Sequence, residues 1–320
     1  MVKLVNRGNK ATKTGFGEGL LEAGIDNGSV VAIGADITAS VGVDLFASKF
    51  PSRFISLGIA EQNCVGVAAG MALAGKIPVF ATYGVFSSLR TTDQVRISLC
   101  YNNLHVIIGG AHTGVSVGPD GATHQALEDI AIMRVLPNMT VLSPCDATQA
   151  RLAVIAAVEQ CNGPVYLRFG REAMPDFTTP EMGFAIGKAQ LLHHGNDLAI
   201  ISTGHMTWEA LRAAYELEKE GIMARVLNIH TIKPLDETAL VEAARECGAI
   251  ATAEEHQVAG GLGSAVSEVI SKNHPVPMEF VGMNDRFGES GPPLELMRKF
   301  GLTAENIITA CRKALERKRR

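Results

Sequence analysis

A single carboxylate stands where a short strand turns into an almost wholly apolar helix. Glu61 follows the extended run 53–56 and the turn 57–60, and the stretch 64–73 after it is almost entirely small or apolar. Unpaired N–H groups and the dipole at a helix N-terminus stabilise a carboxylate, so Glu61 can be a simple capping residue. A carboxyl group that enters a buried helix needs a partner, and burial raises its pKa toward the range where it shares a proton. Capping and proton sharing are therefore the two interpretations of Glu61.

Aromatic side chains follow the next buried strand. The run 78–82 is largely apolar, and Tyr83 and Phe86 stand on the turn after it. Aromatic faces stack on flat heterocyclic rings and exclude water from them. For either residue alone, packing in a core is the favoured interpretation.

The strongest group of polar residues lies in a glycine-rich loop. His112 follows the strand 104–109, Asp120 comes eight residues later, and His124 comes four residues after that. Histidine exchanges a proton near neutral pH and often serves as a general acid or base. The glycines around Asp120 allow turns that direct a carboxylate inward. A lone loop histidine is usually structural, whereas these three residues together indicate a site.

Four further polar residues could bind an anion or a cofactor. Asp36 and Ser40 follow one predicted strand, Arg171 follows another, and Lys13 lies at the start of the first predicted helix. Ligands of open α/β sheets gather at the carboxyl ends of the strands. The fork of an arginine fits phosphate oxygens, whereas lysine supplies charge without the fork. For Asp36, helix capping is the competing interpretation.

The elements that must position these residues form an α/β pattern. Apolar strands alternate with helices, which predicts mostly parallel sheets covered by helices on both faces. The predicted organisation is two domains, each a mostly parallel sheet flanked by helices: residues 1–175, a linker rich in proline and acids at 176–186, and residues 187–320.

Individual elements follow from local signals. Asp146 is expected to cap a helix that reaches residue 160. The glycine-rich run 260–263 resembles a phosphate cradle, but tight packing at a helix start is the favoured interpretation. The predicted strands are 30–34, 53–56, 78–80, 104–109, 139–142, 165–168, 198–202, 224–228, 249–252 and 278–281; the predicted helices are 12–26, 61–73, 85–100, 123–134, 146–160, 207–220, 237–245, 260–271 and 304–318.

Composition narrows the class of protein. The chain has 320 residues, of which 47% are hydrophobic, and its net charge is −4. This charge gives no reason to expect a nucleic-acid surface. Six scattered cysteines lack zinc-type spacing, no signal peptide is recognisable, and no apolar run approaches a membrane span. These features predict a cytoplasmic protein with reduced thiols that binds neither nucleic acid nor membrane.

The Glu61 turn, the aromatic turn and the double-histidine loop, in this order and spacing, resemble the pyrimidine-binding domain of the transketolases. The resemblance covers residues 11–315 and includes the transketolase C-terminal domain. It implies thiamine diphosphate as cofactor, with Glu61 as the catalytic acid on ring nitrogen N1′ and Phe86, Tyr83 and Asp36 near the cofactor. His124 is implied to be a second catalytic residue, in proton transfer at the reacting oxygens.

The resemblance also implies a substrate site. His112, Arg171 and Ser40 correspond to residues that contact the anionic end of a sugar phosphate, and Asp120 to one that contacts a hydroxyl group. Lys13 stands where the family has an arginine. This departure leaves open whether the anion is phosphate or another group.

A complete transketolase also holds Mg²⁺ and the diphosphate through a Gly-Asp-Gly followed by an Asn, and this pair is absent from the sequence, since Pro119-Asp120-Gly121 belongs to the double-histidine loop. We therefore expect no metal ligand in this chain. The expected protein is the C-terminal subunit of a split transketolase, active with an N-terminal subunit in an α₂β₂ heterotetramer on sugar or sugar-phosphate substrates.

Three alternatives share parts of the pattern. A β subunit of a 2-oxo acid dehydrogenase and a deoxyxylulose phosphate synthase-like enzyme share the architecture and the glutamate. His124, in the run Asp-Gly-Ala-Thr-His-Gln, favours a transketolase over both. A non-catalytic α/β scaffold is the third alternative.

Overall fold

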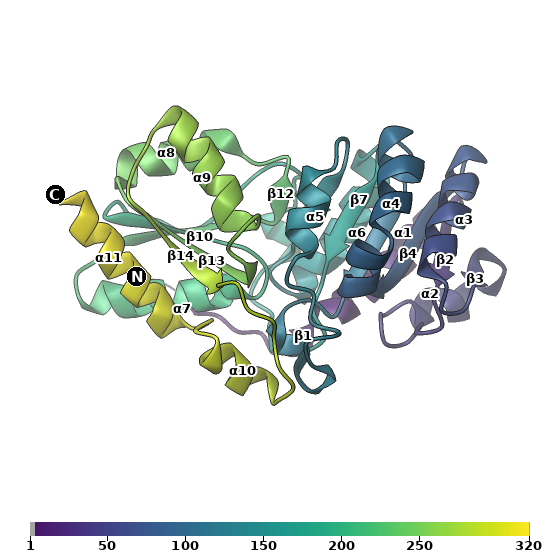
Figure 1. The fold of residues 1–320 in the computed structure, drawn as a ribbon, viewed down its shortest axis with the longest axis horizontal. Helices are drawn as coiled ribbons and strands as arrows, with labels where there is room; N and C mark the ends of the chain where they lie inside the picture. Colours follow the sequence, from purple (N-terminus) through teal and green to yellow (C-terminus); the bar gives the residue numbers. More distant parts are fainter. Residues whose placement is uncertain (1–3, 320) are drawn as a thin grey trace.

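The computed structural model describes residues 4–319, which form two larger sheets flanked by helices and one short ribbon (Figure 1). The predicted α/β class with mostly parallel sheets is confirmed. The first sheet has seven strands in the order β12 (Thr231–Lys233), β6 (Thr140–Leu142), β7 (Val165–Arg168), β5 (Ile107–Ala111), β4 (Ile77–Tyr83), β2 (Val30–Gly34) and β3 (Phe54–Ser56).

Six strands of the first sheet are parallel, and β12 alone runs antiparallel, beside β6. The strands β2 and β5 are buried along their whole length. Continuous burial explains why their sequences are unbroken apolar or glycine runs, because helices cover both faces of the sheet.

The second sheet lies at the other end of the molecule (Figure 1). Its order is β14 (Met278–Met283), β13 (Ile250–Gln257), β10 (Leu198–Ser202), β11 (Ala224–Asn228) and β9 (Gln190–His193). The first four strands are parallel and β9 is antiparallel at the edge. A separate two-stranded ribbon joins β1 (Asn9–Ala11) to β8 (Ala173–Pro175).

Helices α1 (Thr12–Asp26) and α6 (Ala147–Gln160) share one apolar core on one face of the first sheet. Their crossing is close, because a Cβ built on Gly15 would lie 1.9 Å from the carbonyl oxygen of Ala147. As expected, Asp146 caps α6: its side chain accepts a hydrogen bond from the Gln149 amide. This packing fixes the start of α1, where Lys13 lies.

The opposite face of the first sheet carries α3 (Glu61–Leu73), α4 (Thr92–Gln94) and α5 (Asp129–Val135). One apolar cluster extends from Cys64 and Phe80 on this side to Ile201 and Leu262 in the second half of the chain. The other helices are α2 (Asp44–Lys49), α7 (Met206–Lys219), α8 (Glu237–Cys247), α9 (Leu262–Asn273), α10 (Pro293–Lys299) and α11 (Ala304–Lys318).

Two predicted helices differ from the structure. The helix expected at 123–134 begins only at Asp129, because the preceding residues 115–120 form a 3₁₀ turn between glycines with positive φ. The helix expected at 85–100 contains two π-helical turns, 86–90 and 95–101. Side-chain hydroxyls there bond to carbonyls four residues back, as Ser88 does to Gly84, which disturbs regular helix.

The strands β1, β8, β9 and β12 and the helices α2 and α10 were not predicted. The strand β12 comes from the second half of the chain yet completes the first sheet, so the two halves are joined by more than a linker. Among residues 4–319, every helix is too short or too polar to cross a lipid bilayer.

Candidate active site

The polar residues singled out in the sequence lie on loops at one edge of the first sheet. Because β3, β2, β4, β5 and β7 are parallel, the loops that follow them leave the sheet at the same edge. In sheet order this edge carries Glu61, at the start of α3; Asp36 and Ser40; Tyr83 and Phe86; His112, Asp120 and His124; and Arg171. Tyr83 is the last residue of β4, not part of the turn after it.

Glu61 is the first residue of α3, and its side chain is 3% exposed. Arg90 Nη1 donates a hydrogen bond of 2.8 Å to Glu61 Oε2. The same guanidinium lies over the ring of Phe86, 4.1 Å from its centroid. Arg90 was missed from the sequence, although its spacing of four residues from Phe86 places both side chains on one side of a helical turn.

The two aromatic residues and the two histidines form one cluster of rings. The centroid of Tyr83 lies 4.3 Å from that of His112 and 5.5 Å from that of His124. Phe86 meets His124 edge to face at 5.4 Å. The structure therefore brings together four residues proposed from separate motifs.

His112 is buried and strained in a way that is typical of a functional residue. Its φ is 55°, and its Nδ1 has no hydrogen-bond partner within residues 4–319. Burial, together with the charges of Lys13 and Arg171, lowers the pKa of His112 to about 4, although the charge of Asp120 opposes the shift. The imidazole is therefore neutral at pH 7 and can donate or accept a hydrogen bond.

The loop that carries Asp120 and His124 is held by the second half of the chain. The Ser116 amide donates a hydrogen bond of 2.6 Å to Glu255 Oε1, and Gln125 Nε2 donates one of 2.8 Å to the carbonyl of Glu289. Gly114 is required there, because it has a φ of 82° and a Cβ would lie 2.2 Å from the Glu255 carboxyl group. The helix α10 packs on the same loop.

Two cations lie at the outer end of the site. Arg171 Nη1 forms an ion pair of 2.9 Å with Asp120 Oδ1. The neighbouring Gly170 amide donates to Thr12 Oγ1 over 2.7 Å, which fixes this loop beside the start of α1 and Lys13. Both cations act on His112, so all three face one region.

Asp36 and Ser40 share the loop after β2. Asp36 has a φ of 68° and an exposed side chain. Within residues 4–319, neither side chain forms a hydrogen bond or an ion pair. Their loop reaches α1, because a Cβ on Gly42 would lie 2.5 Å from the carbonyl oxygen of Lys13.

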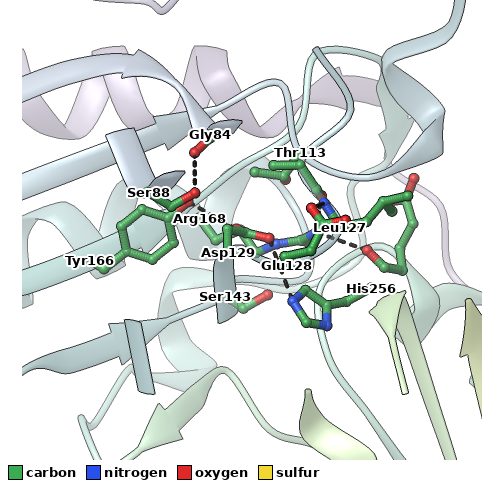
Figure 2. A network of polar contacts seen from close by, with 12 residues as sticks. Gly84, Ser88, Thr113, Leu127, Glu128, Asp129, Ser143, Tyr166, Arg168 and His256 are labelled. Atoms are coloured by element: carbon green, nitrogen blue, oxygen red, sulfur yellow. Dashed lines mark hydrogen bonds and ion pairs between the residues drawn. The ribbon is translucent and has the colours of Figure 1, made fainter. Parts of the chain in front are cut away.

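A buried polar network lies beneath the site (Figure 2). Asp129 Oδ2 accepts hydrogen bonds of 2.9 Å from Tyr166 and from Arg168 Nε, and its Oδ1 lies 3.8 Å from His256 Nε2. Arg168 Nη2 also donates to the carbonyl of Glu255. The network joins β7, α5 and β13, and sequence reasoning missed its role, because its members lie far apart in the chain.

An open cleft of about 690 Å³ lies beside Phe86 and Arg90. Its lining includes Phe86, Arg90, Glu128 and the exposed ring of Phe287. Burial raises the pKa of Glu128, so this carboxyl group lies in a partly dry environment.

The residues present fit an aminopyrimidine ring. The Glu61 carboxyl group and the ring of Phe86 both contact the planar guanidinium of Arg90. A flat heterocycle that donates a hydrogen bond needs the same two partners, a buried carboxyl group and an aromatic face. Within residues 4–319, no group of three or more His, Cys, Asp or Glu side chains is arranged to hold a metal ion.

Comparison with known proteins covers nearly the whole chain. Residues 9–176 match the transketolase pyrimidine-binding domain, and residues 187–307 match the transketolase C-terminal domain. A 6-deoxy-6-sulfo-D-fructose transketolase subunit from Clostridium sp. (strain MSTE9) is 44% identical, over 93% of this chain and 92% of the relative. A subunit of an apulose-4-phosphate transketolase from Phocaeicola vulgatus is 40% identical, over 96% of this chain and 97% of the relative. A solved split-gene transketolase, described as an inactive β4 tetramer, is 48% identical with a TM-score of 0.90, over 96% of this chain and 99% of that one.

Proposed function

The chain belongs to the transketolase family, and we propose that it is the C-terminal subunit of a two-chain transketolase that moves a two-carbon ketol unit from a ketose to an aldose. The single observation that supports this most is the meeting of Glu61, Phe86 and the two histidines at one edge of the first sheet. Thiamine diphosphate, when bound, supplies the carbanion chemistry of the transfer.

Glu61 has the central role among this chain's residues. Its carboxyl group holds a proton at N1′ of the pyrimidine ring, in a place where burial excludes competing water. Phe86 and Tyr83 cover the ring, and Asp36 lies at the edge of the cofactor site. His124 moves a proton at the substrate oxygens, and the neutral His112 offers a hydrogen bond to the substrate.

The substrate is proposed to be an anionic ketose. Lys13, Arg171 and Ser40 bind the anionic end, and Asp120 accepts a hydrogen bond from a hydroxyl group. The names of the two relatives specify a sulfonated and a phosphorylated substrate, and both are anions. A lysine at position 13 is compatible with either anion, because it supplies charge without the bidentate geometry of arginine.

Activity is proposed to require an N-terminal partner subunit in an α₂β₂ heterotetramer. That partner holds Mg²⁺ and the diphosphate. The six cysteines are all unpaired, which supports a reducing compartment and hence the cytoplasm.

A reconstitution tests this function. The purified chain is mixed with the N-terminal subunit, thiamine diphosphate and Mg²⁺ and offered phosphorylated, sulfonated and uncharged ketoses with aldose acceptors. The proposal predicts turnover with an anionic ketose by the mixture and none by the chain alone. Turnover of pyruvate with glyceraldehyde 3-phosphate instead would show a synthase. If the mixture turns over neither an anionic ketose nor pyruvate, the proposal is wrong.

A further inference from the structure

Arg90 makes two contacts with the residues that the proposed function assigns to the pyrimidine ring. Its Nη1 donates to Glu61 Oε2 over 2.8 Å, and its planar guanidinium covers Phe86 at 4.1 Å from the ring centroid. A pyrimidine that stacks on Phe86 and shares its N1′ proton with Glu61 needs the same carboxylate and the same aromatic face. Two planar groups cannot occupy one position.

We propose that Arg90 is an internal competitor of the cofactor: its side chain fills the pyrimidine position and must leave before thiamine diphosphate can bind. This inference rests on the proposed function. It assigns to Arg90 a role in regulating access to the site, whereas the chemistry remains with Glu61.

The two ends of the ion pair differ in exposure. The Glu61 side chain is 3% exposed and the Arg90 side chain is 44% exposed. The arginine can therefore move toward solvent while the carboxylate stays in place. Loss of Arg90 would leave the buried Glu61 carboxylate without a cation, so the incoming pyrimidine must replace that contact by sharing its N1′ proton with Glu61.

The backbone of Arg90 is tied to α3, whereas its side chain is partly exposed. Gln62 Nε2 donates a hydrogen bond of 3.1 Å to the Arg90 carbonyl, so α3 and the π-helical turn 86–90 stay together. The adjoining cleft of about 690 Å³ offers the displaced guanidinium a second carboxylate, Glu128, and the ring of Phe287. The cleft that Arg90 lines thus contains a second carboxylate besides Glu61.

The closing experiment measures binding of thiamine diphosphate to the assembled two-chain enzyme with Mg²⁺, by calorimetric titration. Removing the competitor in Arg90→Gln is expected to tighten binding about fivefold, because the binding-competent state is then fully populated. Arg90→Lys, which keeps a charge for Glu61 but cannot cover Phe86 with a flat group, is expected to give about a twofold gain. The control Arg312→Gln removes another Arg–Glu pair, with Glu220 on the far surface, and should leave binding unchanged.

A second readout separates competition from a purely structural role. In the chain alone, Arg90→Gln should lower the thermal midpoint, because Glu61 loses its partner, while the affinity of the assembled enzyme rises. Opposite signs support the proposal. Unchanged or weaker binding by both Arg90 variants overturns it while the proposed function stands. A wild-type assembly that binds no thiamine diphosphate overturns both.

Discussion

Two helix starts, one in each half of the molecule, use a carboxylate in opposite ways. In the first half, Glu61 belongs to α3 itself, and among residues 4–319 its carboxyl group forms a hydrogen bond only with the partly exposed Arg90. In the second half, Glu254 on β13 reaches the start of α9, where its two oxygens accept hydrogen bonds from the amides of Leu262 and Gly263. The chain thus fills the second helix start itself.

The difference shows what makes a helix N-terminus available for a ligand. A Cβ on Gly261 would lie 2.0 Å from Glu254 Oε2, so the glycines of 260–263 make room for the carboxyl group of this chain. The interpretation of this run as packing is confirmed. At the first helix start, the partner of Glu61 is instead Arg90, a partly exposed side chain that lines an open cleft.

The largest expected effect is on chemistry at the first helix start. Glu61→Gln should lower turnover of the reconstituted enzyme by about 10²–10⁴-fold, because an amide cannot share the N1′ proton. Its stability should change by less than about 1 kcal/mol, since Gln still accepts from Arg90. Steady-state kinetics and urea unfolding measure the two effects. Glu254→Gln is the matched variant and should keep its turnover. If it loses turnover as Glu61→Gln does, the two helix starts do not differ in function.

The next effect concerns the junction of the two halves. Arg168→Met should lower the free energy of unfolding by about 3–5 kcal/mol, because Asp129 would remain as a buried charge without its cation. Urea denaturation measures it. The exposed pair of Arg312 and Glu220 is the control, where Arg312→Met should cause a much smaller loss because water screens both charges. Equal losses in both variants would mean that the network in Figure 2 does not bind the halves together.

A pH effect is expected at the second helix start, from Glu254. Burial raises the pKa of Glu254 from 4.5 to about 8, although the two amide hydrogen bonds and nearby arginines oppose the rise. A raised pKa means that the folded chain holds the proton more tightly than the unfolded chain. Its contribution to stability is therefore complete below pH 4.5 and declines as pH rises toward 8, on the order of 5 kcal/mol in total.

Unfolding free energies measured from pH 5 to 8 check this dependence. Wild type should lose stability across the window, and Glu254→Gln should show a flatter profile. Identical slopes in the two proteins would show that Glu254 is ionised throughout.

The smallest effect is expected at the outer end of the first half. Lys13→Arg should lower KM for a phosphorylated ketose about threefold, because a guanidinium pairs with two oxygens at once, and Lys13→Gln should raise KM about tenfold. kcat should hardly change, since the proposed role of Lys13 is to bind the anionic end of the substrate and not the reacting carbonyl. A kcat loss as large as that of Glu61→Gln would place Lys13 in the chemistry.

Local sequence signals predicted much of the fold. The strands β2 and β5 and the helices α1, α3 and α6 follow from apolar runs, periodicity and the Asp146 cap. The grouping of site residues also followed, because parallel strands place their loops at one edge.

Other features depend on long-range contacts that a sequence pattern does not carry. The delayed start of α5 depends on positive φ at three glycines in the double-histidine loop. The carboxylate partners of Arg90 and Arg168 lie 29 and 39 residues away in the sequence, so no local pattern predicts these ion pairs. The pairing of β12 with β6 joins residues about 90 positions apart, for example Thr231 with Leu142.

The late arrival of β12 has a consequence for synthesis of the chain on the ribosome. All other strands of the first sheet are complete once Arg168 has been made, but the hydrogen-bonding edge of β6 stays bare until Lys233 emerges. A nascent chain in that interval presents an unpaired strand, which is a template for aggregation. A fragment truncated after residue 176 would keep that open edge permanently.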